Sequence, residues 1–216
     1  MRRVARLLLV TAVGGALLFA LAGTIRDAWL WAYLAVFAAV ATVAMLSISD
    51  DLARERFRPP APSADHLSLK AIRIVAIAHL VVAVLDGSRF HWTHVPAWLR
   101  IIGLTGFGLS FVLVVRAMAA NRFFSAVVRI QDDRGHRVVD RGPYAVVRHP
   151  GYAGMIPAVP FSALALGSWI AFPIAVVYSA LIWRRVQFED RFLHENLEGY
   201  GAYARRVRYR LVPSLW

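Results

Sequence analysis

The sequence predicts an all-α integral membrane protein with about six transmembrane helices and a cytosolic C-terminal amphipathic helix. The 216 residues are 59% hydrophobic and only 18% charged, which is too apolar for the surface of one soluble domain. Apolar segments recur that approach the roughly 20 residues needed to cross a hydrocarbon core. Basic residues collect in alternate connections between these segments, as they do in membrane proteins.

Six apolar segments are the expected spans. The first follows Met-Arg-Arg and could pass for a signal peptide, but it is longer than a typical signal core and another span follows closely, so we expect a retained helix. The spans are Leu7–Ile25, Ala28–Ile48, Ala71–Leu85, Ala97–Met118, Tyr152–Leu166 and Trp169–Trp183.

A single membrane domain, residues 1–216, is expected. Residues 1–118 supply the N-terminal spans, and residues 119–216 form the catalytic part, because the polar detail is concentrated after Met118.

Charge placement predicts the orientation. With the N-terminus in the cytosol, all but three of the 25 basic residues fall on the cytosolic side, leaving Arg26, Arg89 and Arg100 outside. Both termini and the chemical site are then cytosolic. The net charge of +12 is explained by this anchoring and by anionic lipid, and we expect no nucleic-acid partner. Every basic residue except Lys70 is arginine, which favours a GC-rich genome and a bacterial cell membrane.

The most unusual polar segment is VVDRGPYAVVRHPGYAG, residues 138–154. Pro150 suits the first position of a helix, whose free N–H groups attract an anion such as a carboxylate. Tyr144 and Tyr152 offer aromatic faces for a cation. These residues alone are equally well explained as an interfacial turn at the lipid headgroups.

Residues 184–207 carry apolar side chains every three or four positions, which predicts the amphipathic helix. Arg185 and Glu189 lie four residues apart on it, and a surface ion pair is the ordinary explanation of that spacing. The pair follows Trp183 at the hydrocarbon edge, however, and Asp190 adds another acid there. Charges near low dielectric are costly, which favours a functional role.

Other patterns are structural. GLTGFG, residues 103–108, lies within a span and predicts helix packing through small residues. His79 is expected to be buried and hydrogen-bonded. His91 and His94 lack a third ligand, and the sequence contains no cysteine, so no metal site is expected.

The C-terminal half resembles the isoprenylcysteine carboxyl methyltransferase family of membrane enzymes, which is related to the phospholipid methyltransferases. HRVVDRGPYAVVRHPGYAG and WRRVQFEDRFLHENLEGYGAYARRV carry the resemblance, which covers residues 131–213. It implies a pocket for S-adenosylmethionine that lacks a Rossmann fold and lies at the cytosolic ends of the last spans. It assigns the acceptor to Arg185. The cofactor contacts that it implies are Gln131, His136, Arg137, Val138, Val139, Tyr144, His149, Pro150, Gly151, Tyr152 and Glu189.

The resemblance thus implies methyl transfer from S-adenosylmethionine to a carboxylate of a lipophilic, possibly isoprenoid, acceptor, either a small molecule or a lipidated partner entering from the membrane lipids. An ionised carboxylate needs no general base, and Arg185 would bind it in bidentate geometry. Three alternatives stay open: a phospholipid or amine N-methyltransferase, a scaffold without enzymatic activity, and an NADPH-dependent reductase of the sterol type. Such reductases tend to have an acid where this chain has Met155 and Ile156.

Overall fold

The computed structural model describes residues 2–59 and 63–216, and in this part of the chain every regular element is helical. Two 3-10 turns, η2 (Asp132–Arg134) and η3 (Gly142–Ala145), interrupt the long connection after α5, and a π-helical turn, η1 (Leu85–Phe90), extends α4. The α-helices are α1 (Arg2–Ala22), α2 (Ala28–Ser47), α3 (Asp50–Phe57), α4 (His66–Val84), α5 (Ala97–Ala120), α6 (Pro150–Leu166), α7 (Ala171–Asn196) and α8 (Tyr200–Arg206).

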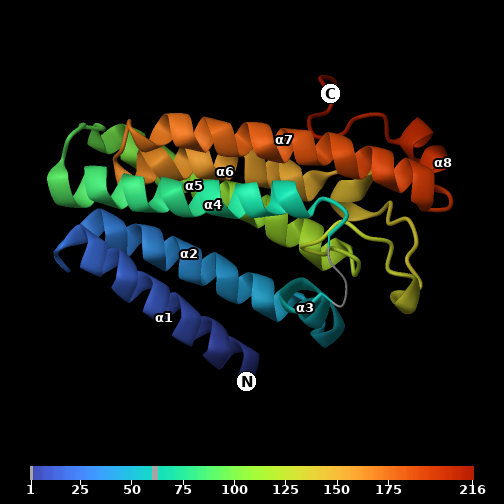
Figure 1. Ribbon diagram of the computed structural model, residues 1–216, viewed down its shortest axis with the longest axis horizontal. Coiled ribbons are helices and arrows are strands. Elements are labelled where there is room, and N and C mark those ends of the chain that lie inside the picture. Colours follow the sequence, from blue (N-terminus) through green and yellow to red (C-terminus); the bar gives the residue numbers. More distant parts are fainter. Residues whose placement is uncertain (1, 60–62) are drawn as a thin grey trace.

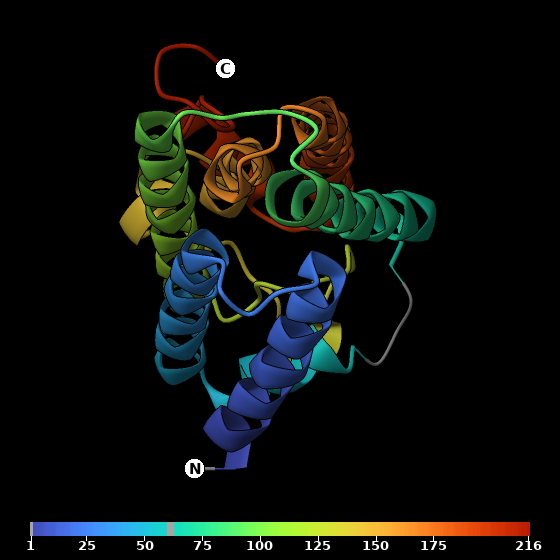
Figure 2. The same cartoon turned by 90° about the vertical axis from the view of Figure 1, so that its left-hand side faces the viewer.

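The long helices lie along one axis in two groups (Figures 1 and 2). Helices α4 to α7 pack together, with α6 in contact with α4, α5 and α7, while α1 and α2 lie against one side of this group. The short helices α3 and α8 and the long connection between α5 and α6 gather at one end, and the α1–α2 and α4–α5 connections lie at the other (Figure 1). The segment richest in polar groups therefore covers one end of the bundle.

Within residues 2–59 and 63–216, three helices are long and apolar enough to cross a membrane: Ala28–Ser47, His66–Phe90 and Ala97–Ala120. Leu9–Ala22 and Pro150–Leu166 are shorter apolar helices. The expected all-helical membrane protein is confirmed in this coarser form, while the number of six spans stays a prediction. The expected span Ala71–Leu85 is part of a longer helix, because α4 starts at His66 and continues into the π-helical turn.

Small residues allow α5 and α6 to approach closely. A Cβ atom at Gly103 would lie 2.5 Å from the Ala165 nitrogen, and one at Gly106 would lie 2.6 Å from the Phe161 ring. The packing role predicted for GLTGFG is confirmed. Nearer the polar end, a Cβ at Gly154 would lie 2.5 Å from the Ser110 oxygen, so the first turns of α6 are fixed directly against α5.

The C-terminal region differs from the single amphipathic helix expected over residues 184–207. Helix α7 runs from the last apolar segment straight through to Asn196, because no Gly or Pro interrupts the chain between Trp183 and that residue. The chain then turns at Gly199, which has a φ of 79°, before the short α8. Because α7 is continuous, Arg185 and Glu189 are held on a rigid extension of a bundle helix.

Two buried polar side chains within the bundle, His79 and Asp86, are hydrogen-bonded. His79 is 2% exposed and lies 3.1 Å from the Ser162 hydroxyl through its Nε2, as expected for a buried, hydrogen-bonded histidine. At the end opposite the polar loop, the buried Asp86 carboxylate accepts hydrogen bonds from the Thr93 N–H at 2.7 Å and the Ser168 hydroxyl at 2.6 Å. These contacts tie neighbouring helices together.

Candidate functional site

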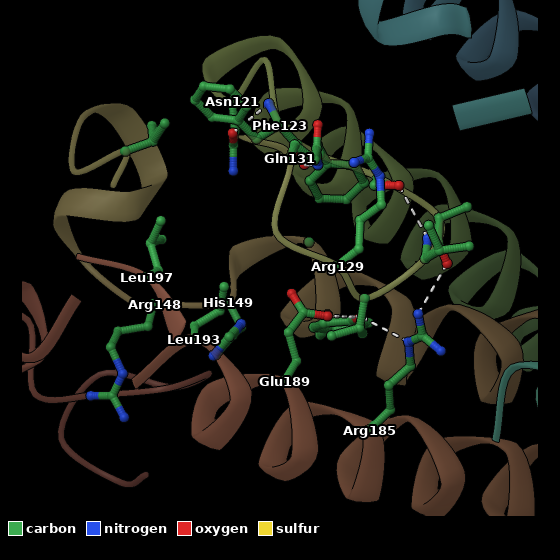
Figure 3. Close-up of a pocket in the computed structure, with 18 of the residues that line it drawn as sticks. Asn121, Phe123, Arg129, Gln131, Arg148, His149, Arg185, Glu189, Leu193 and Leu197 are labelled. Carbon is green, nitrogen blue, oxygen red and sulfur yellow. Dashed lines mark hydrogen bonds between the residues drawn. The ribbon is translucent and has the colours of Figure 1, made fainter. Parts of the chain in front are cut away.

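A cavity of about 250 Å³ opens at the polar end of the bundle. It is enclosed by the connection between α5 and α6, the first turn of α6, the C-terminal half of α7, the start of α4 and parts of α3 and α8. Figure 3 shows Arg185 and Glu189 rising from α7 toward the loop that carries Phe123 and Gln131. Segments far apart in the sequence thus build one enclosure.

The start of α6 forms one wall. Pro150 is the first residue of the helix, and the N–H groups of Arg148 and His149 before it donate to the Tyr209 and Arg210 carbonyls, both at 2.9 Å. The first-turn N–H groups after Pro150 have no carbonyl of their own helix to bind. The helix start is therefore held by the C-terminal segment and directs its partial positive charge toward the polar loop.

Gly151 lies in a tight contact with the loop between α5 and α6. A Cβ atom at this position would lie 2.4 Å from the Phe124 ring, so the ring packs directly on the helix backbone. The Arg56 guanidinium of α3 lies 5.0 Å from the centroid of the same ring. Burial lowers the pKa of Arg56, and in the described part of the chain no carboxylate pairs with this guanidinium. An arginine that lines a cavity without an acidic partner favours an anionic ligand.

Asp190, 2% exposed, holds the wall together from behind. It binds Arg148 in bidentate geometry at 2.9 and 3.0 Å, and it also binds His149 and the hydroxyl of Tyr200 at 3.0 and 2.9 Å and Arg210 at 2.8 Å. Burial acts to raise the pKa of this carboxyl, but the bonds from His149, Arg148 and Arg210 outweigh it and hold the pKa far below its usual range. Asp190 thus fixes the start of α6 to α7 and α8.

Arg185 and Glu189 are joined through Tyr152 rather than directly. The Arg185 Nε donates to the Tyr152 hydroxyl at 3.0 Å, and that hydroxyl donates to the Glu189 carboxylate at 2.6 Å, as the dashed lines in Figure 3 trace. Arg185 also donates to the Ala126 carbonyl at 3.0 Å and is 3% exposed. The surface ion pair considered from the i, i+4 spacing is therefore not what the structure contains.

The loop between α5 and α6 supplies the remaining wall. The Gln131 amide is 1% exposed and donates to the Phe123 carbonyl at 2.8 Å. The His136 ring packs 4.7 Å from that of Phe123, and burial lowers its pKa to about 4. Val138 packs on an apolar cluster that includes Tyr200. This part of the cavity is flat-sided, apolar and edged with amide groups, a composition suited to an aromatic heterocycle.

The predicted site residues come together with one exception. All of the residues implied by the family resemblance line the cavity except Pro150, which is buried at the start of α6 and acts through the helix geometry. Their chemical roles stay predictions. Further lining residues not predicted from the sequence are Arg56, Asn121, Phe123, Phe124, Leu193, Leu197, Tyr200 and Tyr203.

Two of these lining residues have a sequence signal, because Tyr200 and Tyr203 lie in GYGAY, within one of the two segments that carry the resemblance. Arg56 has none, because its position between two apolar segments does not indicate that α3 reaches the cavity.

Within the described residues, the fold and the site define an all-helical membrane protein with a cavity of mixed polar and apolar lining at one end of its bundle. Comparison with known proteins adds a family to this class. The model of the isoprenylcysteine carboxyl methyltransferase (ICMT) family matches residues 101–195. The match begins within α5, upstream of the residues whose motifs carried the resemblance, and includes Arg185 and Glu189.

Individual relatives agree with this match. Protein-S-isoprenylcysteine O-methyltransferase B of Arabidopsis thaliana is 28% identical over 132 residues, covering 58% of this chain and 63% of the relative. A probable protein-S-isoprenylcysteine O-methyltransferase of Oryza sativa subsp. indica is 32% identical over 114 residues, 46% of this chain and 56% of the relative. The chain thus spans somewhat more than half of the length of these relatives.

A relative of another description is also similar. The nickel-cobalt-cadmium resistance protein NccN of Alcaligenes xylosoxydans xylosoxydans is 25% identical over 158 residues, 71% of this chain and 70% of the relative. The family match and the relatives named as methyltransferases support the ICMT family and confirm the resemblance indicated by the sequence motifs.

Proposed function

We propose that this protein is an S-adenosylmethionine-dependent membrane methyltransferase that methylates the carboxylate of a lipophilic acceptor of the isoprenoid class. The observation that carries the proposal is the convergence of the α6 start, Tyr152, Glu189 and Arg185 on one cavity. The relatives named as isoprenylcysteine O-methyltransferases add the acceptor class.

The residues around the cavity fit S-adenosylmethionine. The Glu189 carboxylate suits its ammonium group, and the first turn of α6 together with the unpaired Arg56 suits its carboxylate. The apolar wall near Val138 and Val139 suits adenine. One zwitterionic ligand would therefore satisfy an acid, a guanidinium and a helix terminus at once.

In methyl transfer, the main tasks of this chain would be to align the methyl donor with the acceptor and to exclude water. S-adenosylmethionine supplies, when bound, an electrophilic methyl group on a sulfonium. Arg185 would hold the acceptor carboxylate, and it stays protonated, so it takes no proton. The Tyr152 hydroxyl orients the guanidinium through the bond at 3.0 Å. An ionised carboxylate needs no general base, so positioning accounts for the catalysis that these residues provide.

An acceptor with a hydrocarbon tail matches the apolar part of the cavity lining. Helices α4, α6 and α7 supply this part in the residues Leu69, Ile72, Met155, Tyr178 and Ile182. Helix α4 belongs to a segment apolar enough to cross a membrane. The acceptor would thus place its charged end at Arg185 and its tail along the bundle.

Ligand-dependent thermal unfolding of the detergent-purified protein tests the proposal. A ligand that binds only the folded state raises the midpoint. We expect S-adenosylhomocysteine to raise it and NADPH to leave it unchanged. A shift with NADPH alone would favour the reductase and overturn the methyltransferase.

The acceptor is tested separately by transfer of radiolabelled methyl from S-adenosylmethionine. N-acetyl-S-farnesylcysteine carries the expected tail and carboxylate, and its C-terminal amide is the matched control. Labelling of the acid and not of the amide is expected. Labelling of a dialkylamine or of phosphatidylethanolamine to the same extent as the acid would instead indicate N-methylation.

A further inference from the structure

Asp65 lies beside Arg185 in an unusual contact. One of its carboxylate oxygens, Oδ2, is 3.7 Å from the Arg185 Nη1, which is too long for a hydrogen bond. Both atoms are buried, and neither has a hydrogen-bond partner among the described residues. The side chains of Asp65 and Arg185 are 11% and 4% exposed. A buried donor and a buried acceptor thus face each other without satisfying one another.

Asp65 does not serve its own helix. It is the residue before α4, a position where aspartate ordinarily accepts a hydrogen bond from the first turn. Here its side chain caps no N–H group of α4. The Asp65 carboxylate makes no capping hydrogen bond and lies beside Arg185 instead, so helix capping does not explain the orientation of this side chain.

The backbone at Asp65 is fixed to the wall of the cavity. The Ala64 N–H donates to the Val128 carbonyl at 2.9 Å, and the Ser63 hydroxyl accepts from the Val128 N–H at 3.0 Å. The same hydroxyl accepts from the Asp65 N–H at 3.2 Å. Val128 lines the cavity. Residues 63–65 are therefore held against a segment that lines the cavity, and this fixes the position of Asp65 beside Arg185.

One nitrogen of the Arg185 guanidinium has no hydrogen-bond partner among the described residues. Its Nε donates to Tyr152 and its Nη2 to the Ala126 carbonyl. Nη1 has no such partner, and Asp65 lies on that side. A carboxylate bound to Arg185 would have to take the place of the Asp65 carboxylate, since two adjacent anions repel.

We propose that Asp65 is a specificity-determining residue whose carboxylate competes with the carboxylate of the acceptor for the Nη1 side of Arg185. The inference rests on the proposed function. It adds that Asp65 is the partner of Arg185 when no acceptor is bound. A neutral acceptor cannot displace Asp65, whereas an anionic acceptor replaces a loose ion pair with hydrogen bonds to Arg185.

The competition also favours product release. Methylation forms a C–O bond as the sulfonium C–S bond breaks, with the electron pair staying on sulfur, and it converts the acceptor carboxylate into a neutral ester. The ester no longer pairs with Arg185, and Asp65 returns to it. Asp65 thus weakens the binding of the anionic acceptor and takes back Arg185 once the neutral product has formed.

The test compares Asp65→Asn and Asp65→Ala with wild type. The Asn variant keeps the shape and removes the charge, and the Ala variant removes the contact. If Asp65 holds Arg185 in about nine molecules of ten, its loss lowers the acceptor KM about tenfold. We expect this fall for N-acetyl-S-farnesylcysteine, an unchanged inhibition constant for its neutral methyl ester, which does not compete with Asp65, and unchanged binding of S-adenosylhomocysteine.

Asp140→Asn is the matched control. It removes one negative charge from the same end of the bundle, where Asp140 pairs with Arg206 at an exposed site outside the cavity. We expect no change in acceptor KM. Equal falls in this control and in Asp65→Asn would show a general charge effect and overturn the proposal.

Opposite results have distinct meanings. An unchanged or raised acceptor KM in both Asp65 variants, with S-adenosylhomocysteine binding intact, overturns the competition. Calorimetric binding of the acceptor reads the same competition without turnover. Tighter binding in the variants without any methylation would therefore overturn the proposed function and support the role of Asp65. Absence of acceptor binding to every variant overturns both.

Discussion

Two carboxylates lie behind residues that line the cavity, Asp190 behind Arg148 and Asp65 behind Arg185, and their surroundings are opposite. Asp190 receives hydrogen bonds from two arginines, a histidine and a tyrosine, with distances from 2.8 to 3.0 Å. Asp65 faces Arg185 at 3.7 Å and leaves its Oδ2 without a hydrogen bond. One carboxylate is saturated by the fold, and the other is not.

The difference separates scaffold from working site. A buried charge that is fully hydrogen-bonded fixes the elements it joins, whereas an unsatisfied buried group costs free energy. Such a cost is retained where a ligand can relieve it. Asp190 therefore belongs to the frame that orients the α6 start, and the Arg185–Asp65 pair belongs to the part that changes partner during the reaction.

The largest expected effect is on Asp190. Asp190→Ala leaves Arg148 and His149 buried without their acid, and breaking a buried pair in this way costs about 3–5 kcal/mol. We expect a large fall in the unfolding midpoint together with loss of S-adenosylhomocysteine binding. Asp65→Ala should change the midpoint little. Similar midpoints for the two variants, read by thermal unfolding in detergent, would contradict the division into scaffold and working site.

Arg185 should separate turnover from cofactor binding. Arg185→Ala removes the guanidinium that we assign to the acceptor, so turnover should fall by about 10²-fold or more while S-adenosylhomocysteine binding persists. Arg185→Lys keeps the charge but loses the planar fork, and it should restore little. Methyl transfer and calorimetry measure the two properties. Loss of cofactor binding in the Lys variant would show that Arg185 contacts the cofactor and not the acceptor.

Glu189 should show the reverse behaviour. Glu189→Gln removes the charge that would pair with the cofactor ammonium, and a hydrogen bond to a charged group contributes about 1.5–3 kcal/mol, or a tenfold to hundredfold weaker affinity. Glu195→Gln is the control, because Glu195 is exposed on the same helix outside the cavity. Calorimetry with S-adenosylhomocysteine measures both. Equal affinities for the two variants would remove Glu189 from the cofactor site.

The sequence predicted the composition of the cavity better than its internal contacts. The motif around Tyr144 and Tyr152 and the later Arg185 and Glu189 were identified because family motifs preserve residue type and spacing. The hydroxyl of Tyr152 between Arg185 and Glu189 was not predicted, because the i, i+4 spacing suggests a direct pair.

Contacts contributed by distant segments escaped prediction. Asp65 and Arg56 lie in the connection between the second and third apolar segments, far in sequence from α7. Nothing local indicates that this connection folds under the loop that follows α5. The extent of α7 was missed for a different reason: hydropathy marks where a helix leaves the apolar region, and a helix without a breaker continues past that point.

The smallest expected effect tests the loop wall through His136. Burial lowers the pKa of this imidazole to about 4, below its ordinary value of about 6.5. Between these values the unfolded chain binds a proton that the folded chain refuses, so the contribution of His136 to stability is fully present above pH 6.5 and is lost as the pH falls toward 4. His136→Gln should flatten the dependence of the unfolding midpoint on pH in this window. The stability supplied by Asp190 is lost only in stronger acid, because its pKa lies below the usual carboxyl range. An unchanged slope between pH 6.5 and 4 in the Gln variant would mean that the His136 ring is not held neutral by the wall, and that the loop is packed less firmly than the Asp190 side of the cavity.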